Sequence, residues 1–457
     1  MGQGQEVMAA YLAGGDDIVR MARGFAANAS PLAKKNRILD VIGRNAQWRG
    51  RECLNLIAPE ALMSPTVRRA LSSEFSQRAA EGEIGDRWFA GQAYIDELEA
   101  LCVEYLKQCF NANYADHRLV SGMVANIAVY TAFTQPGDII LSIAQPLGGH
   151  SSNRDDGPAG IRGLRVVDLP MDPVELVVDV EGFRRAAERE RPRLVALGAS
   201  MTLFPFPLEA LRRIADELGF ILYFDGAHQA GLCAGGQFQA PLAEGADVLT
   251  GSTGKTFSGP QGGVIAYSKP EHDRMIRPVI FPAVAATHQV NRVAALAIAA
   301  AEMLEFGRSY MGQIVTNARA LGRVLAQRGF TLLGAHKGFT DTHQVILDLS
   351  RGIRGYEAAR LLERANIIAN KNLLPGDRPA DWARPGGLRL GTTEVTRLGM
   401  GLAEMARIAD WFHWVLVARE APERVAAEVR AFREDFQTVY YCFENGLPPN
   451  GAVEPRR

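Results

Sequence analysis

The middle of the chain alternates short aliphatic or β-branched runs with longer segments whose apolar residues recur at helical spacing. This alternation is typical of β-α-β units, in which helices cover a largely parallel sheet. Helices are predicted at Tyr94–Phe110 and Leu208–Leu218. The pattern predicts the strands Ile139–Ile143, Leu194–Ala199, Ile221–Phe224, Val248–Thr250 and Gly263–Tyr267. Folds of this kind place their chemistry at the strand ends and in the loops that follow.

The pattern changes around residues 307–313, where a long helix precedes a second, smaller α/β region. Residues 1 to about 50 read as helices without a core of their own, so we expect an arm that packs on this molecule or on a partner subunit. The sequence therefore predicts a helical arm at 1–55, a large domain at 56–308 and a small C-terminal domain at 309–457. Predicted elements of the small domain are the strands Val345–Asp348 and Leu388–Leu390 and the helix Tyr356–Asn366.

Composition narrows the class of protein. The chain has 457 residues, of which 47% are hydrophobic and 22% charged, as is ordinary for a globular protein. The 50 Lys+Arg balance the 51 Asp+Glu, so no overall charge favours nucleic acid or an anionic membrane, and a small-molecule or protein partner is expected. The most apolar run, Val293–Leu304, is about half a bilayer span and is read as a buried helix.

Cysteine usage and the N-terminal segment bear on location. Five scattered cysteines without a C-x-x-C pair indicate neither a metal site nor a disulfide framework. The first residues lack the basic and apolar regions of a secretory signal. We therefore expect a cytoplasmic protein with no membrane partner.

The most informative stretch is Ile221–Lys255. A hydrophobic strand ends in Asp225, His228 follows, and the next strand runs into a Gly-Ser-Thr-Gly-Lys segment that ends at Lys255. An aspartate and a lysine at neighbouring strand ends could meet opposite edges of pyridoxal 5'-phosphate, whose aldehyde forms a Schiff base with lysine. A phosphate-binding P-loop is the competing interpretation, but its first glycine falls on Leu249, so the motif fails.

From about Leu54 onward the chain resembles the serine hydroxymethyltransferase branch of the fold type I pyridoxal-phosphate enzymes. The matching motifs, in family order, are residues 56–60 (LIAPE), 81–89 (EGEIGDRWF), 121–126 (SGMVAN), 148–150 (GGH), 225–228 (DGAH), 254–263 (GKTFSGPQGG), 370–372 (NKN) and 388–392 (LRLGT). The resemblance implies an aspartate aminotransferase-like α/β fold with a mostly parallel seven-stranded sheet. It also implies a pyridoxal 5'-phosphate-dependent enzyme of the transferase or aldolase type.

Roles for individual residues follow from the resemblance. Lys255 would hold the cofactor, Asp225 would pair with its ring nitrogen, and His150 would stack on its ring. Arg389 would bind the substrate carboxylate in a bidentate fork, and Glu81 would act as acid or base near the substrate hydroxyl. The further cofactor contacts that the resemblance implies are Ser121, Gly122, Met123, Ser200, His228, Ser252, Gly262 and Gly263. Since the family takes Glu81 and the paired glycines from a neighbouring subunit, an obligate homodimer is expected, and pairing into tetramers stays open.

Several positions depart from the family pattern around the substrate and the folate pterin. A single tyrosine, a tyrosine pair, a histidine, an arginine, a glycine-rich segment and two pterin-flanking leucines are replaced. These positions are Ala79, Trp88-Phe89, Gly254, Gln261, residues 283–287, Gln145 and Ser151. The residues expected to bind the cofactor are kept, while residues on the pterin side and part of those expected to bind the substrate are replaced.

The departures favour a folate-independent enzyme acting on β-hydroxy-α-amino acids. It would cleave L-threonine or L-serine to a glycine quinonoid and then protonate it, as an aldolase does, or transfer it to another aldehyde, as a transaldolase does. The first alternative is a serine hydroxymethyltransferase that uses tetrahydrofolate. Another cofactor-dependent reaction at the α- or β-carbon, or a weakly active relative used for binding, also stays open.

Overall fold

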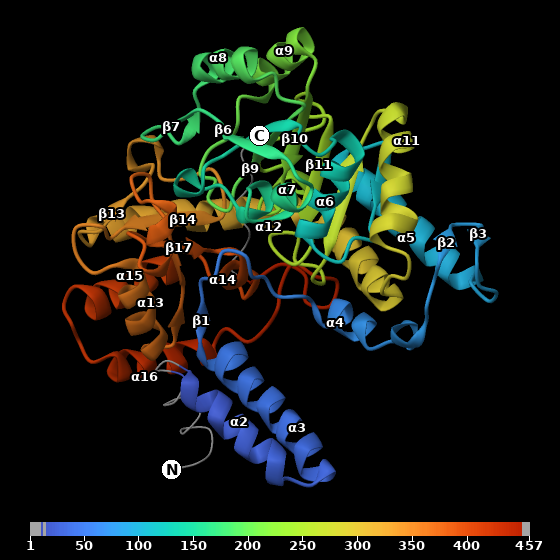
Figure 1. Cartoon of the computed structure of the whole chain (residues 1–457). Helices are drawn as coiled ribbons and strands as arrows, with labels where there is room; N and C mark the ends of the chain where they lie inside the picture. Colours follow the sequence, from blue (N-terminus) through green and yellow to red (C-terminus); the bar gives the residue numbers. More distant parts are fainter. Residues whose placement is uncertain (1–10, 12–14, 450–457) are drawn as a thin grey trace.

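A seven-stranded sheet forms the centre of the larger part of the chain in the computed structural model, which describes residue 11 and residues 15–449 (Figure 1). Its strand order is β4-β12-β11-β10-β9-β5-β6, and only β12 runs antiparallel to its neighbours. The strands are β4 (Tyr114–Asp116), β5 (Ile139–Ser142), β6 (Arg165–Asp168), β9 (Leu194–Gly198), β10 (Ile221–Asp225), β11 (Val248–Ser252) and β12 (Gly263–Tyr267). The predicted mostly parallel sheet is thus confirmed.

Helices cover both faces of this sheet, so its central strands are almost wholly apolar and buried. Successive residues of a strand point to opposite faces, and accordingly Phe224 joins one hydrophobic core while Tyr223 joins the other. One face is covered by α5 (Ala93–Phe110), α8 (Val180–Glu190), α9 (Leu208–Leu218) and the first half of α12 (Val290–Gln327). The other is covered by α6 (Gly122–Phe133), α7 (Pro158–Ile161) and α11 (Pro270–Pro278).

A smaller antiparallel sheet follows in the order β13-β14-β17-β16. Its strands are β13 (Thr331–Leu332), β14 (Gln344–Asp348), β16 (Asn370–Asn372) and β17 (Gly387–Gly391). Its helices are α13 (Gly355–Arg364), α14 (Thr393–Arg397), α15 (Leu402–Leu416) and α16 (Pro422–Glu434). The predicted elements of this region are therefore present, with shifts of one or two residues at their ends.

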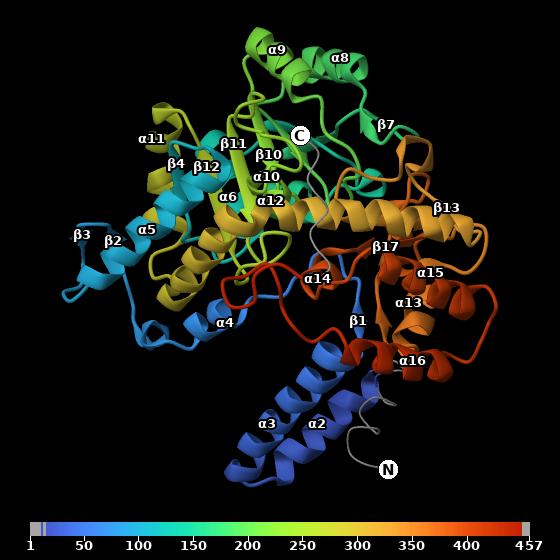
Figure 2. The same ribbon diagram turned by 180° about the vertical axis from the view of Figure 1, so that it is seen from behind.

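Helix α12 joins the two regions. Val293 and Leu296 belong to the core of the large sheet, whereas Leu321 and Leu325 belong to that of the small one. Figure 2 shows α12 as one long helix that runs from the large sheet to the small one. The boundary predicted at residue 308 lies inside it, and the division into domains stays a prediction.

The N-terminal helices α2 (Asp16–Asn28) and α3 (Pro31–Gln47) project from the rest of the chain (Figures 1 and 2). Ser30 caps α3, because its hydroxyl accepts a hydrogen bond from the Ala33 N–H, and Pro31 follows as the first helical residue. Neither helix contains a buried residue. Exposed apolar side chains on the pair include Val19, Leu32, Ile38, Leu39 and Ile42.

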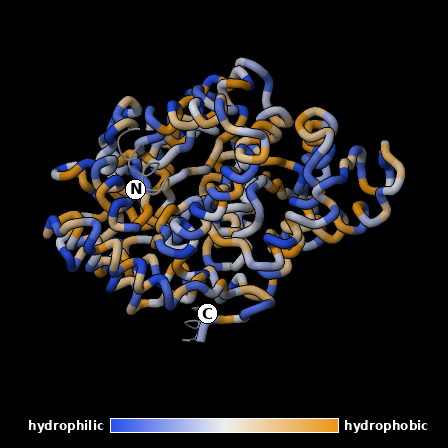
Figure 3. Tube along the Cα trace, turned by 90° about the horizontal axis from the view of Figure 1, so that it is seen from below, coloured by the Kyte–Doolittle hydropathy of each residue, from blue (hydrophilic) through white to orange (hydrophobic). Residues whose placement is uncertain are grey.

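Short elements complete the described chain. They are the strand pairs β1 (Leu54–Asn55) with β15 (Ile367–Ile368), β2 (Gly82–Glu83) with β3 (Asp86–Arg87) and β7 (Met171–Asp172) with β8 (Val177–Val178), and the helices α4 (Pro65–Leu71) and α10 (Ala230–Ala234). Figure 3 shows hydrophilic and hydrophobic residues interspersed along the trace. Within residues 15–449, no helix has both the length and the apolar character needed to cross a membrane.

Candidate active site

Several of the predicted site residues gather where the parallel strands of the large sheet end. Asp225 is the last residue of β10 and pairs with Thr250 on β11, and Lys255 follows three residues after β11 ends. His150 follows β5, and Ser200 follows β9, where Gly149 and Ala199 form a bridge. Because the carboxyl ends of parallel strands meet at one edge of a sheet, these side chains share one edge.

The Asp225 carboxylate is buried and held by neutral donors. Its Oδ2 accepts hydrogen bonds from the amide nitrogens of Asn126 and Asn153, at 2.8 and 3.0 Å. Its Oδ1 accepts a hydrogen bond from the Ala227 N–H at 3.1 Å. Because these donors carry no charge, they orient the carboxylate without neutralising it. A protonated ring nitrogen is the kind of partner that such a buried carboxylate fits.

Two buried tyrosines fix the amides that hold Asp225. The Tyr223 hydroxyl donates to Asn126 Oδ1 at 2.7 Å, and the Tyr130 hydroxyl donates to Asn153 Oδ1 at 2.6 Å. Since each amide oxygen accepts from a tyrosine, each amide nitrogen must face away from that tyrosine, toward the carboxylate. The aspartate is therefore positioned by two layers of polar side chains.

Lys255 lies partly buried beside this carboxylate. Burial lowers the pKa of its amine to about 8, with the Asp225 charge opposing and the Arg389 charge adding to the shift. A larger neutral fraction near neutral pH makes the amine a better nucleophile toward an aldehyde. Lys255 and Asp225 together therefore fit the two ends of pyridoxal 5'-phosphate.

His150 has a defined tautomer. Its Nδ1 accepts the Ser152 backbone N–H at 3.1 Å, so the proton of the neutral ring sits on Nε2. Burial, together with the charge of Lys255, lowers the pKa of His150 and favours this neutral ring. The Ser152 hydroxyl also accepts from Asn126 at 3.0 Å. The ring predicted to stack on the cofactor is thus tied to the amide that holds Asp225.

The start of α6 forms a cradle with the end of β11. Ser121 caps α6 by accepting the Val124 N–H at 3.2 Å. A Cβ added at Gly122 would lie 3.6 Å from the Ser252 Cβ, and one added at Gly263 would collide with the Ser121 carbonyl. A helix N-terminus with a closely approaching backbone suits a phosphate group. Met123, in the first turn of α6, is exposed.

Arg389 reaches this edge from the small sheet. It lies on β17, donates from Nη1 to the Ser200 carbonyl, and donates from Nε to Asn370 Oδ1 at 3.2 Å. Burial lowers its pKa to about 10, so the guanidinium still carries its charge at neutral pH. A buried guanidinium at the edge of the site suits a carboxylate ligand.

Glu81 lies apart from these residues. It precedes the β2–β3 hairpin, which projects beyond α5 (Figures 1 and 2), and it accepts a hydrogen bond from the Thr287 hydroxyl. Within the described chain, no hydrogen bond joins Glu81 to Lys255 or Asp225. Gly262, also predicted to act in a neighbouring site, packs so closely against Arg292 that a Cβ there would collide with the guanidinium.

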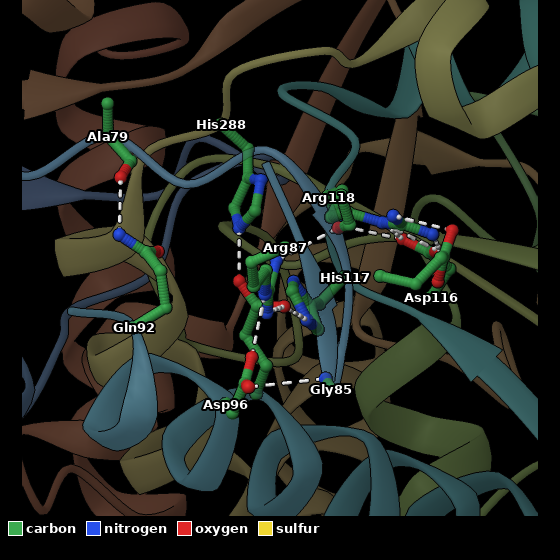
Figure 4. A network of polar contacts seen from close by, with 12 residues as sticks. Ala79, Gly85, Arg87, Gln92, Asp96, Asp116, His117, Arg118 and His288 are labelled. Carbon is green, nitrogen blue, oxygen red and sulfur yellow. Dashed lines mark hydrogen bonds and ion pairs between the residues drawn. The ribbon is translucent and has the colours of Figure 1, made fainter. Parts of the chain in front are cut away.

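A buried ionic network anchors the hairpin that follows Glu81 (Figure 4). Arg87 donates to Asp96 and to Glu99, each at 2.6 Å, and His288 Nε2 lies 2.5 Å from the other oxygen of Glu99. Burial opposes ionisation of Glu99, but the hydrogen bonds from His288 and Arg87 lower its pKa to about 2. His117 lies 3.9 Å from the same carboxylate. The network fixes the hairpin to α5 and to the residue after Thr287.

Four of the departures from the family pattern fall on two places. Ala79 and the exposed Trp88 belong to the hairpin region, where Trp88 packs edge-to-face on Phe281 at 5.3 Å. Gly254 and Gln261 are neighbours, because a Cβ at residue 254 would lie 2.9 Å from the Gln261 side chain. The departures at Gly254 and Gln261 therefore lie in contact with each other.

Sequence reasoning did not identify the residues that position the site. Asn126 stands inside a recognised motif, and its polar side chain among apolar residues of α6 is a usable signal. Asn153, Tyr130, Tyr223 and Gln344 stand in no motif, and their contacts join segments far apart in the chain. Only the folded arrangement brings them to Asp225 and His228.

Comparisons with known proteins agree with this geometry. A family model described as serine hydroxymethyltransferase matches residues 32–412. The serine hydroxymethyltransferase of Korarchaeum cryptofilum is 45% identical over 428 residues, covering 91% of this chain and 98% of that protein. That of Methanocaldococcus jannaschii is 44% identical over 413 residues, covering 90% and 96%. The crystal structure of L-threonine transaldolase from Pseudomonas fluorescens superposes with a TM-score of 0.82 at 27% identity, covering 91% of this chain and 95% of that one.

Proposed function

The chain belongs to the serine hydroxymethyltransferase family, and from that premise we propose that it cleaves β-hydroxy-α-amino acids without folate. L-Threonine and L-serine are the expected substrates, and glycine and an aldehyde are the products. In transaldolase mode, the glycine carbon would join a second aldehyde in place of a proton. Bound pyridoxal 5'-phosphate would supply the electron sink for this chemistry.

Individual residues of the chain would have separate roles in this reaction. Lys255 would hold the cofactor, Asp225 would keep its ring nitrogen protonated, and Arg389 would bind the substrate carboxylate. Glu81 of a neighbouring subunit would take the proton of the β-hydroxyl as the Cα–Cβ bond breaks and the aldehyde leaves. A proton returned to Cα would then give glycine.

One observation carries this proposal: the strand-end set around Asp225 and Lys255 is complete, whereas the hairpin region and pterin-side positions are rewritten. Loss of the folate contacts, with retention of the cofactor set, is what a folate-independent enzyme requires. The likeness to an L-threonine transaldolase structure supports the same reading.

The second candidate is a serine hydroxymethyltransferase that uses tetrahydrofolate. The observation that favours it is the 45% identity to the Korarchaeum cryptofilum protein of that name, which exceeds the 27% identity to the transaldolase. The two candidates share every cofactor-binding residue. They differ in whether folate takes up the one-carbon product.

Aldehyde release separates these candidates. The purified holoenzyme is incubated with L-threonine or L-serine, with and without tetrahydrofolate, and aldehyde and glycine are quantified. We expect acetaldehyde from L-threonine at a rate that tetrahydrofolate leaves unchanged. Serine cleavage only in the presence of tetrahydrofolate would instead establish the second candidate. Lys255→Ala serves as the inactive control for both.

We further propose that the enzyme is a homodimer located in the cytoplasm. Support for the dimer comes from Glu81, which directly precedes a projecting hairpin and has no hydrogen bond to Lys255 within the described chain, and from the uncovered helices α2 and α3. All five cysteines are free, and four of them are buried, which suits a reducing compartment.

A further inference from the structure

The side chain of Gln344 lies between the two regions of the chain, at the edge of the candidate site. It is fully buried at the start of β14 in the small sheet. It contacts three groups of the large region: the Thr202 N–H, the Ser200 carbonyl and the ring of His228. Gln344 therefore touches two of the residues predicted to bind the cofactor.

The orientation of this amide is determined by its partners. The Thr202 backbone N–H can only donate, and it lies 2.9 Å from Gln344 Oε1. The Ser200 carbonyl can only accept, and it lies 2.9 Å from Gln344 Nε2. Flipping the amide would place donor against donor and acceptor against acceptor. The nitrogen must therefore be the atom that faces His228.

This orientation determines the tautomer of His228. Gln344 Nε2 lies 3.2 Å from His228 Nδ1, and because an amide nitrogen can only donate, Nδ1 must accept. Burial lowers the pKa of His228 well below its usual range, which keeps the ring neutral. A neutral ring whose Nδ1 accepts carries its only proton on Nε2.

The other groups around His228 are compatible with this assignment. His343 stacks on it with ring centroids 5.5 Å apart, and its Nε2 lies 3.4 Å from the same Nδ1, longer than an ordinary hydrogen bond. The charges of Lys255 and Arg389 also disfavour a protonated imidazole.

We propose that Gln344 is a positioning residue that holds His228 as the Nε2-protonated tautomer and holds the Ser200 carbonyl that orients Arg389. A donor at His228 Nε2 suits the ring oxygen of the cofactor, which accepts hydrogen bonds. The shared carbonyl links this donor to the guanidinium predicted to bind the substrate carboxylate. The roles in binding cofactor and substrate rest on the proposed function, whereas the assignment of the His228 tautomer does not.

The first test is the tautomer of His228 in the apoprotein. The chain is labelled with nitrogen-15 in its histidine rings, and the His228 signals are assigned with His228→Asn. We expect a protonated Nε2 and an unprotonated Nδ1 in the wild-type protein. A protonated Nδ1 would overturn the proposal, and this result is independent of any enzymatic activity.

The second test changes Gln344. Gln344→Glu keeps the size but turns an oxygen toward Nδ1, so the His228 proton should move to Nδ1. Gln344→Met removes the donor, so both tautomers of His228 should be populated and should interconvert. In the holoenzyme, Gln344→Met should raise KM for L-threonine or L-serine about tenfold, with a smaller change in kcat, since one hydrogen bond is lost from the group that orients Arg389.

Gln239→Met is the matched control. Gln239 is also buried and bonds the backbone of Phe206 through both ends of its amide, but it contacts none of the predicted site residues. This variant should leave the His228 signals and KM unchanged. Unchanged His228 signals in both Gln344 variants would overturn the proposal. A tautomer that shifts as expected in a protein that cleaves no amino acid would contradict the proposed function alone.

Discussion

At the scale of single residues, Lys255 is the side chain whose chemistry depends most directly on burial. Its pKa falls from 10.5 to about 8, so the neutral amine predominates only above that pH. Below it, the rate at which the apoprotein captures pyridoxal 5'-phosphate should fall about tenfold per pH unit. Above it, the rate should level off. Stopped-flow absorbance at pH values from about 6 to 10 measures this profile.

Two variants serve as controls for the predicted pH profile of Lys255. Lys255→Ala should show no covalent capture at any pH. Lys269→Ala, which removes a partly exposed lysine paired with Asp247, should reproduce the wild-type profile. A capture rate still rising steeply above pH 9 would mean that the reacting amine has an ordinary lysine pKa of about 10.5.

Asp225 should control the reaction through its charge. A carboxylate about 4 Å from a ring cation, at an effective dielectric of about 20, is worth about 4 kcal/mol. Asp225→Asn keeps the size but removes this charge, so kcat should fall roughly a thousandfold. Aldehyde release measures kcat, and absorbance measures how much cofactor stays bound. A variant with full cofactor and wild-type kcat would contradict the role assigned to Asp225.

At the scale of elements, the β2–β3 hairpin depends on the carboxylate of Glu99. Glu99→Gln would leave the buried His288 without its charged partner and would leave Arg87 paired with Asp96 alone. We expect the free energy of unfolding to fall by about 3 kcal/mol. Glu104→Gln on the same helix is the control, since Glu104 is exposed and its ion pair with Lys107 should contribute little. Urea unfolding at neutral pH compares the two.

Acid should reproduce part of this loss. The pKa of Glu99 is lowered from 4.5 to about 2, so the folded state favours the ionised form. The stability it contributes is present above pH 4.5 and is lost as the pH falls toward 2. The difference in the free energy of unfolding between wild type and Glu99→Gln should therefore become smaller over this pH range. A constant difference would mean that Glu99 does not ionise as described.

The elements also show what the sequence could predict. The short apolar runs in the sequence predicted the ends of β9 and β10 to within one residue, because buried parallel strands are continuous apolar runs. The structure has Asp225 as the last residue of β10 and Lys255 three residues after β11, close to the strand ends that the sequence predicts for them. Periodicity carries no signal for Asn153 or Gln344, since their roles depend on partners brought close by folding.

The arm makes a prediction of its own. Ile38 and Ile42 lie on α3 and are about 60% exposed, which is unusual for aliphatic side chains of a helix pair unless another surface covers them. We expect a second copy of the chain to cover them. Ile38→Glu with Ile42→Glu should therefore weaken the dimer, whereas Lys35→Glu should not. Sedimentation equilibrium distinguishes the variants, and equal dimer constants would contradict the prediction.

At the scale of the whole molecule, the site joins both regions of the chain. Asp225, Lys255 and His150 come from the large sheet, whereas Arg389 comes from the small sheet and donates to the Ser200 carbonyl. The continuous helix α12 packs into both cores, so the two sheets are held to one frame. A group bound between them should stabilise the chain as a unit.

Removal of the cofactor should therefore lower the stability of the entire protein. Without it, the buried Asp225 carboxylate is held only by neutral donors, and the amine of Lys255 has no partner in a Schiff base. A ligand at about a hundred times its Kd adds about 2.7 kcal/mol. Thermal unfolding of the holoprotein and of the apoprotein should thus give a clearly higher Tm for the former. Because part of this gain comes from the ring cation beside Asp225, Asp225→Asn should reduce the difference in Tm. An equal gain in both proteins would mean that the cofactor stabilises the chain through its phosphate and Lys255 alone.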